Sequence, residues 1–352
     1  MDSLEFCTTA GRKKHSVVAV SSAGWLNETN KYLPDLLNAE KLIVPKDAKL
    51  AASCAGFVQW GIQESESKTR LRQYARELAR PLAYIEDGFI RSFDIGLSHE
   101  PGRSIILDDL AFYYDATKPS RLETILNSDF KPNFIERWKT RDAIHYITRN
   151  RISKYNNAPE ELPADLSRAS GRKKILLIDQ RAGDASIAGA LASESSFKRM
   201  VDEAFKHKDA DVIVKIHPDA LTPGKFSAIS PSLGEYKGDK RLHVISEAVN
   251  PYVLFDFVDE VFVVASGMGF EAVMAGKSVS CFGVPYYAGW GVTNDYKEPL
   301  RSRKKRSLED IFHVAWMRLS RYVDPSSRKL VSVKAAAKTL ASERQRQGLT
   351  AS

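Results

Sequence analysis

Residues 261–273 read VFVVASGMGFEAV. The apolar run Val261–Ala265 is typical of a buried β-strand, and the small residues that begin at Ser266 form a loop that opens a helix. A strand that passes through such a loop into a helix is the repeating unit of a parallel sheet covered by helices on both faces. This stretch therefore predicts an α/β fold.

The same unit recurs in both halves of the chain. In the first half we predict strands at Ser16–Val20, Lys41–Val44, Gly56–Trp60, Leu82–Ile85 and Ile105–Leu107. We predict helices there at Lys68–Ala79 and Ser120–Leu126. In the second half we predict strands at Lys174–Asp179, Val212–Ile216, Leu242–Ile245, Glu260–Val264 and Val279–Phe282. We expect two Rossmann-like domains that face each other across a cleft, with ligands beyond the carboxyl ends of the strands. Transferases, epimerases and phosphorylases share this layout, so architecture alone does not select an activity.

Breaks in the pattern predict the domain boundaries. Residues 133–163 are polar and helical in propensity, and the chain is interrupted at Asn156-Asn157-Ala158-Pro159 and again at Pro163. We therefore expect an N-terminal Rossmann-like domain at 1–150, a linker at 151–170 and a C-terminal Rossmann-like domain at 171–300. Residues 301–352 form a basic helical segment that we expect to pack back on the first domain.

Composition narrows the class of protein. A chain of 352 residues with 43% hydrophobic and 27% charged residues predicts a globular core. The cysteines Cys7, Cys54 and Cys281 are widely spaced, which argues against a zinc knuckle or a disulfide framework. The net charge of +8 predicts an anionic partner: an anionic substrate, an acidic membrane or a nucleic acid. Nucleic acid ranks last, because the sequence has no RNP, zinc-finger or basic-zipper pattern.

The start of the chain and its apolar runs bear on its location. The sequence has no run of about 18 apolar residues, as a membrane span needs, and its polar start lacks the apolar core of a signal peptide. We therefore expect a cytosolic or peripheral protein.

Two loops that follow predicted strands of the second half carry candidate chemistry. Asp184 follows the strand Lys174–Asp179 and is either a nucleophile, base or ligand, or the N-cap of a helix. Lys215 and His217 lie at the end of the next strand, where both side chains can donate to a phosphate; the alternative is a turn with a solvated lysine.

The opening motif supplies a third loop. The backbone N–H groups that follow Ser266 at the start of a helix can receive a phosphate. Glu271 lies in the first turn, where its carboxylate either binds a ribose diol or complements the helix dipole. Together with Lys215 and His217, this loop favours a phosphate pocket.

Acidic pairs also follow two strands of the first half. Glu86-Asp87 and Asp108-Asp109 both suit general acid/base work, and the alternatives are a tight turn at Asp87-Gly88 and a solvated acidic loop. We prefer the functional interpretation for Glu86.

Six strings in order carry a resemblance to a known family: EDGFIRS, LDDLAFYYDATKPSRLE, DQRAGDASI, KIHPD, SGMGFEAVMAGKSVSCFG and PYYAGWG. Between Tyr84 and Thr293 the chain resembles the KpsC/LipB-type capsule β-Kdo transferases. The resemblance implies a GT-B-like retaining transferase that uses CMP-β-Kdo and a lipid-linked or oligosaccharide acceptor. Typical members carry two such modules in tandem, and this sequence has one, so we expect a single kind of Kdo linkage.

The resemblance also implies roles for residues. It makes Asp184 the nucleophile and Glu86 the acid/base carboxylate, with the first domain on the acceptor side. It implies no cofactor and no metal ion. Nucleotide contacts are expected from Lys215, His217, Ser266, Gly267, Met268, Gly269 and Glu271. Substrate contacts are expected from Arg91, Gln180, Arg181, Ser186, Tyr287 and Trp290.

Two further features have open alternatives. Tyr287 and Trp290 either stack on a sugar or pack within their loop. A basic run precedes apolar residues at helical spacing and either holds an anionic membrane or forms a solvated face beside a packed helix. The basic residues are Arg301, Arg303, Lys304, Lys305 and Arg306, and the apolar ones are Ile311, Phe312, Ala315, Trp316 and Leu319. With the first alternative, the protein is peripheral at the inner face of the inner membrane.

Two other functions remain open from the sequence: a GT-B transferase with another nucleotide sugar, and a non-enzymatic adaptor in capsule export or assembly.

Overall fold

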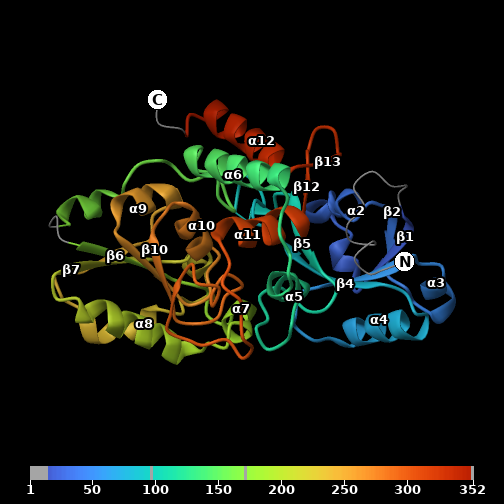
Figure 1. Ribbon diagram of the computed structural model, residues 1–352, viewed down its shortest axis with the longest axis horizontal. Helices are drawn as coiled ribbons and strands as arrows, with labels where there is room; N and C mark the ends of the chain where they lie inside the picture. The colour runs from blue at the N-terminus through green and yellow to red at the C-terminus, as the bar shows by residue number, and fades with distance from the viewer. Residues whose placement is uncertain (1–14, 96–97, 170–172, 350–352) are drawn as a thin grey trace.

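Two sheets, each with helices against it, lie side by side in the computed structural model, which describes residues 15–95, 98–169 and 173–349 (Figure 1). Cys7 lies outside these residues. The helix α6 and the C-terminal helix α12 run together across the top of this view (Figure 1). The helices are α2 (Leu33–Leu36), α3 (Ala48–Ala52), α4 (Glu66–Glu77), α5 (Arg121–Asn127), α6 (Phe134–Arg149), α7 (Ala185–Gly189), α8 (Glu194–Lys206), α9 (Pro251–Phe257), α10 (Met268–Met274), α11 (Leu308–Phe312) and α12 (Val333–Arg346). Short 3-10 turns lie at Ala23–Trp25, Glu28–Asn30, Ala164–Arg168, Pro218–Leu221 and Ser230–Tyr236, and a π turn at His313–Arg318.

The second sheet is parallel throughout, as predicted. Its strands follow the order β11 (Asn294–Asp295), β10 (Ser278–Cys281), β9 (Glu260–Val263), β6 (Lys173–Ile178), β7 (Ala210–Lys215) and β8 (Leu242–Ile245). All six residues of β7, ADVIVK, are buried, as expected for a central strand with helices on both faces. One covering helix, α8, buries Phe197, Met200, Val201, Ala204 and Phe205 at helical spacing.

The first sheet is only partly parallel. Its order is β13 (Leu330–Val331), β12 (Ser320–Val323), β5 (Ser104–Asp108), β4 (Leu82–Asp87), β3 (Gly56–Trp60), β1 (His15–Val20) and β2 (Ala39–Ile43). The expectation of parallel strands holds from β2 to β4, but β5 runs antiparallel to β4, and β12 antiparallel to β5.

The C-terminal segment packs back on the first domain, but the prediction that it is helical is wrong for residues 320–331. The strand β12 reads SRYV, and all four of its residues are buried against the first sheet. Tyr322 and Val323 in this run are residue types that favour strands over helices. The helix α12 then packs on α6. A separate ion pair at 2.8 Å joins Arg103 of the first domain to Glu343 of α12.

One apolar cluster continues through both domains. Phe89, which follows β4, stacks on Trp316 at 4.7 Å between ring centroids, and the same cluster contains Leu176 of β6 and Phe270 of α10. The two sheets are therefore joined by a shared core as well as by the linker. Among the described residues, no helix is both long enough and apolar enough to cross a membrane.

Candidate active site

The strand order of the second sheet places a ligand site at one edge. Strand β6 pairs with β7 on one side and with β9 on the other, so the loops that follow β6 and β9 diverge at their carboxyl ends. Such a switch point is where open α/β sheets bind ligands. Buried Gln180 joins the two loops: its Oε1 accepts the Ala265 N–H at 2.8 Å, and its Nε2 donates to Ser186 Oγ at 3.1 Å.

Asp184 is the N-cap of α7. Its Oδ1 accepts the backbone N–H of Ser186 at 2.8 Å and the Ser186 hydroxyl at 2.7 Å. Gly183 precedes it with φ of +76°, a turn that a residue with a side chain would strain. Among the described residues no hydrogen bond reaches Oδ2, so the cap uses one oxygen and leaves the other available for chemistry.

Glu86 lies near the end of β4 in the opposite domain. Tyr114 donates its hydroxyl to Glu86 Oε1 at 2.9 Å. Burial raises the pKa of Glu86 to about 7, and the nearby Asp87 adds to the shift, while Tyr114 and Lys154 oppose it. A carboxyl group with this pKa can both take and give a proton at neutral pH.

Tyr113 lies next to Tyr114, with 5.4 Å between the two ring centroids. Burial raises the pKa of its phenol, Lys154 opposes this, and Glu86, Asp87 and Asp184 raise it further. A direct contact between the domains holds this arrangement, because the Ala116 N–H donates to Gly189 O, at the end of α7, at 2.7 Å. The segment that carries Tyr113 therefore joins the two candidate carboxylates: its Tyr114 binds Glu86, and its Ala116 binds α7, whose N-cap is Asp184.

His217 follows β7 and is held in one orientation. Its Nδ1 accepts the Asp219 N–H at 3.1 Å, and its own backbone N–H donates to Asp179 at 3.2 Å. Burial lowers the pKa of His217, and Asp184 is among the carboxylates that oppose this shift. The ring is therefore neutral at pH 7, with Nδ1 as acceptor and Nε2–H as the remaining donor.

Lys154 is a candidate site residue that the sequence analysis missed. Its side chain is exposed. Its pKa is raised, first by Tyr155 and then by Asp87 and Tyr113, while loss of water around the ammonium opposes this shift. Its charge also acts on Glu86 and His217, so it lies among the candidate catalytic groups. The available signal was its position in the linker, since a linker between two facing domains passes beside their cleft.

Glu271 does not have the predicted role of ribose contact. Its carboxylate is buried, 4% exposed, and both oxygens accept the Ser153 hydroxyl at 2.9 Å. The Lys154 N–H donates to Oε1 at 3.2 Å, and burial raises the pKa of the carboxyl group to about 7. Glu271 therefore anchors the linker on α10 and fixes the backbone of Lys154.

Arg91 and Lys215 are also committed to the protein itself. Arg91 is 6% exposed and pairs with Asp87 at 2.9 Å, while the Lys154 carbonyl accepts its backbone N–H at 3.0 Å. The Lys215 ammonium is buried and donates to Ile216 O at 3.0 Å, and burial lowers its pKa to about 8. The prediction that Arg91 contacts the substrate is therefore wrong, because its buried guanidinium binds groups of the protein. The nucleotide contact of Lys215 stays a prediction, since this bond uses one of its three N–H donors.

The aromatic loop packs inside the molecule. Tyr287 and Trp290 are fully buried; Tyr287 donates to Ser266 O at 2.5 Å, and Trp290 Nε1 donates to Tyr286 O at 2.9 Å. The prediction of sugar stacking is wrong for both, since no face of either ring is open. Gly269 serves this packing, because a Cβ there would overlap the Tyr287 ring.

The rest of the small-residue loop keeps its predicted place at the switch point. Gly267 is exposed, with nothing within 4 Å of where its Cβ would lie, and Ser266 Oγ accepts the Met268 N–H at 3.3 Å. Ser266, Gly267 and Met268 remain predicted nucleotide contacts. Arg181 is half-buried and pairs through its backbone with Ser227. Gln180 donates to Ser186, and Ser186 donates to Asp184; the substrate contacts of Gln180 and Ser186 stay predictions.

Asp108 and Asp109 are structural. Asp108 is buried and accepts backbone N–H groups from Leu110, Ala111, Arg121 and Leu122, so it caps α5; burial raises its pKa to about 6. Asp109 pairs with Arg121 at 2.7 Å. The functional interpretation of this acidic pair is wrong.

The basic run is a strap between the domains. Arg301 and Arg303 both pair with Glu123 of α5, at 2.5 and 3.0 Å, and Arg303 also lies over Trp290. Arg306 donates to three carbonyl groups at the end of α5, those of Leu126, Ser128 and Phe130.

The apolar residues that follow the run are buried as well. Ile311, Phe312, Ala315, Trp316 and Leu319 are each at most 3% exposed. The prediction that this apolar face meets a membrane is therefore wrong, because the face is part of the core. Of the five cations, the three arginines bind acceptors on or just after α5, while Lys304 and Lys305 are exposed.

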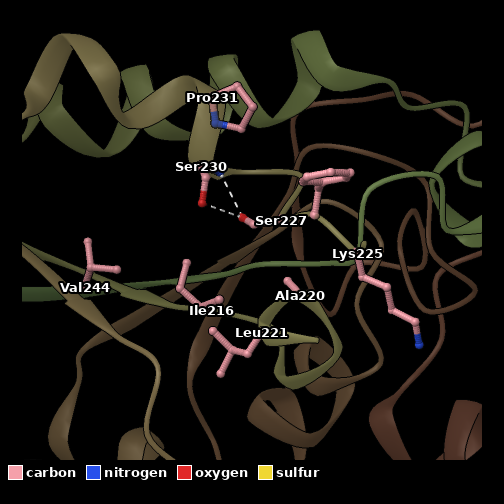
Figure 2. A pocket seen from close by; sticks show the side chains of 9 residues that line it. Ile216, Ala220, Leu221, Lys225, Ser227, Ser230, Pro231 and Val244 are labelled. Atoms are coloured by element: carbon pink, nitrogen blue, oxygen red, sulfur yellow. Dashed lines mark hydrogen bonds between the residues drawn. The ribbon is translucent and has the colours of Figure 1, made fainter. Parts of the chain in front are cut away.

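An open apolar pocket adjoins the loops of His217 and Asp184. Figure 2 shows Ile216, Ala220 and Leu221 on one side and Ser227, Ser230 and Pro231 on the other. The pocket that they line has a volume of about 450 Å³. Phe226, which also lines it, accepts the Ala182 N–H at 2.8 Å, and this bond ties the pocket to the loop that carries Asp184.

Two Rossmann-like domains that face each other over a shared core define a GT-B-like α/β protein. A family model described as "Capsule polysaccharide biosynthesis protein" matches residues 56–322, and the chain belongs to this family.

Relatives by sequence are longer than this chain. The capsule polysaccharide modification protein LipA of Neisseria meningitidis serogroup A is 38% identical over 292 residues, which cover 80% of this chain and 40% of LipA. The lipopolysaccharide-processing protein LpsZ of Rhizobium meliloti is 31% identical over 292 residues, 82% of this chain and 64% of LpsZ.

Two of the solved structures that match almost the whole chain come from one protein. The β-Kdo 2,4 transferase of Thermosulfurimonas dismutans KpsC has a TM-score of 0.82 and 32% identity, and the match covers 93% of this chain and 98% of that one. The β-Kdo 2,7 transferase of the same protein has a TM-score of 0.66 and 24% identity, over 94% and 99% of the two chains, and shows the fold alone.

Proposed function

We propose that this chain is a retaining β-Kdo glycosyltransferase, which moves Kdo from CMP-β-Kdo to a lipid-linked or oligosaccharide acceptor of capsule or another surface polysaccharide. The observation that carries the proposal is the contact between the segment after β5, whose Tyr114 binds Glu86, and helix α7, whose N-cap is Asp184. The match to a structure named as a β-Kdo 2,4 transferase supports it over 93% of the chain.

In the first step Asp184 is the nucleophile. Its Oδ2 attacks the anomeric carbon of Kdo, the bond from that carbon to the phosphate oxygen breaks, and the bonding electrons leave with CMP. His217 donates its Nε2–H to the departing phosphate, and the Lys154 ammonium balances negative charge on the donor. No step is assigned to a metal ion, so transfer should persist in excess EDTA.

In the second step Glu86 is the base. The acceptor hydroxyl attacks the same carbon, Glu86 takes the hydroxyl proton, and the bond to Asp184 breaks. Two inversions at one carbon return the β configuration of the donor. A pKa of about 7 leaves Glu86 partly ionised at neutral pH, as this role requires.

The test is intact-protein mass spectrometry after addition of CMP-Kdo without acceptor. We expect one Kdo-sized adduct that maps to the peptide containing Asp184, and a β-linked product by NMR once acceptor is added. Thermal shift with CMP and with UDP serves as the donor control: CMP should raise the Tm and UDP should not. An α-linked product would overturn the mechanism. A response to UDP alone would point to another nucleotide sugar, and a response to neither would point to an adaptor.

A further inference from the structure

The start of helix α6 exposes three large apolar side chains. Phe134, Ile135 and Trp138 are 83%, 61% and 60% exposed. The capping box of Asn133 and Glu136 holds this first turn, since each side chain binds the backbone N–H of the other residue, so the three side chains stand on a fixed helix. Exposure of a contiguous apolar group on a rigid element indicates a docking surface.

Helix α6 has a buried face and an exposed face, and the position of each residue around the helix axis shows to which face it belongs. Thr140, Ala143 and Ile147 are its buried residues. At 100° per residue, Phe134 and Trp138 point away from that face. The outward stripe continues along the helix through three polar or basic residues, which are also exposed: Arg141, His145 and Arg149.

Charge distinguishes between possible partners. Residues 131–149 contain five basic and two acidic side chains, a net charge of +3. Both acids are engaged: Glu136 in the capping box and Asp142 with Lys334 of α12 at 2.6 Å. Lys131, Arg137 and Lys139 are exposed beside the apolar residues. Arg141 pairs with Glu309 at 3.3 Å but remains 70% exposed.

We infer that the first turns of α6 dock on an anionic lipid bilayer, with Phe134, Ile135 and Trp138 among the headgroups and the neighbouring lysines and arginines against lipid phosphates. Helices that lie at a membrane interface combine aromatic side chains with cations, as Phe134 and Trp138 do here with the neighbouring lysines and arginines. Three apolar side chains make a surface much smaller than the face of a stable protein dimer, which favours a lipid surface over a second copy of the chain. This inference goes beyond the proposed function and does not depend on it, because docking requires no transfer.

The experiment is co-sedimentation of the full chain with vesicles of phosphatidylethanolamine and phosphatidylglycerol. The double variant Phe134→Ser/Trp138→Ser should bind at least fivefold less than the parent, with an unchanged Tm. Binding of the parent should fall with rising salt and should be lost on phosphatidylcholine vesicles. The triple variant Arg137→Gln/Lys139→Gln/Arg141→Gln should weaken binding to anionic vesicles in the same way.

A second apolar patch supplies the matched control. Leu221 and Phe226 are 57% and 71% exposed, but the lysine beside them, Lys225, already faces Asp219 at 4.0 Å. Leu221→Ser/Phe226→Ser also removes two exposed apolar side chains, but from a patch without free cations at its border, and should leave vesicle binding unchanged. In the parent, brominated lipids should quench Trp138 fluorescence, and Trp138→Phe should lose that quenching.

Three results would overturn the inference. Equal sedimentation of the parent and the Phe134→Ser/Trp138→Ser variant would exclude this surface. Equal loss in the Leu221→Ser/Phe226→Ser control would show non-specific adsorption. A concentration-dependent dimer that only the α6 variant abolishes, together with no vesicle binding, would assign the surface to a second copy of the chain.

Discussion

Ser186 donates both its backbone N–H and its hydroxyl to one oxygen of Asp184, Oδ1, at 2.8 and 2.7 Å. An asparagine at 184 can keep both bonds through its amide oxygen, while an NH₂ group replaces Oδ2. We therefore expect Asp184→Asn to fold and to bind CMP like the parent but to lose transfer by about 10³-fold or more, as when a covalent nucleophile is removed.

The control for this prediction is Ser186→Ala, which keeps the carboxylate and removes one of its two donors. It should form the Kdo adduct, at a rate reduced by about tenfold, the cost of one hydrogen bond to a charged group. Full transfer activity in Asp184→Asn would exclude Asp184 as the nucleophile and leave the fold assignment unchanged.

The second prediction concerns His217 and the phosphate. Because its Nδ1 is occupied by the Asp219 N–H, the neutral ring can offer Nε2–H to a ligand. His217→Ala should weaken CMP binding by tenfold or more, since a hydrogen bond to a charged group contributes about 1.5–3 kcal/mol. His217→Gln retains a side-chain donor and should lose less. An unchanged Kd for CMP by calorimetry, in a folded His217→Ala protein, would contradict the assigned pocket.

Lys154 leads to a third prediction, which separates the sugar from the nucleotide. CMP-Kdo carries a carboxylate at the anomeric carbon in addition to the phosphate, so loss of a cation in the cleft should affect the donor more than free CMP. Lys154→Met should raise KM for CMP-Kdo by about tenfold, in the range of one charge-assisted hydrogen bond. Lys154→Arg should recover part of the loss. Equal effects of Lys154→Met and Lys154→Arg, together with a lower Tm in both, would show that Lys154 is only structural.

The fourth prediction addresses the strap that crosses from residues 301–306 to α5. The side chains of Arg303 and Glu123 are 4% and 5% exposed, so removal of the arginine takes a donor from buried Glu123, which keeps Arg301, and from the Ala288 carbonyl. Arg303→Met should destabilise the protein by about 2–3 kcal/mol. The control is Lys304→Met, because Lys304 is 53% exposed and pairs with a fully exposed Asp129. Thermal unfolding should show a Tm several degrees lower for the first variant and an unchanged Tm for the second; equal Tm values would refute the strap.

The strands were predictable from the sequence because each is a short buried run with its own local signal. Gly56–Trp60 and Leu242–Ile245 have the predicted bounds, and the other predicted strands agree within two residues at each end. Direction was harder, because the antiparallel pairing of β5 and β12 depends on a partner far along the chain. The carboxylates Asp184 and Glu86 were found through motifs at strand ends, which is a local property as well.

Partners distant in sequence account for most of the errors. Arg301 looks like a membrane cation until Glu123, 178 residues away, is brought to within 2.5 Å of it. Tyr287 among glycines looks exposed, yet its hydroxyl reaches Ser266 across 21 residues. Lys154 was missed because only the path of the linker between the two domains brings it beside Glu86 and His217. Local composition states which groups are present, and only the packed structure determines which of them are already satisfied.

The last prediction concerns the pH dependence of transfer. Glu86 has a pKa of about 7 in the folded protein, and it must be ionised to take the proton of the acceptor hydroxyl. Transfer should therefore fall as the pH is lowered through about 7. Tyr114 donates to Glu86 Oε1 and favours its charged form, so Tyr114→Phe should raise the pKa of Glu86 and move the acid limb to higher pH. Tyr74, on the far helix α4, is the matched control: Tyr74→Phe should leave the profile unchanged.

Glu86→Gln completes this test, because it removes the base and leaves the nucleophile in place. Transfer should fall by about 10²- to 10⁴-fold, while the Kdo adduct on Asp184 should accumulate, since only the second step needs the base. The measurements are kcat against pH for the parent and the two tyrosine variants, and adduct occupancy by intact-protein mass spectrometry for Glu86→Gln. A shift of the acid limb to lower pH in Tyr114→Phe would show that the titrating group is not Glu86. Loss of the adduct in Glu86→Gln would place Glu86 in the first step instead of the second.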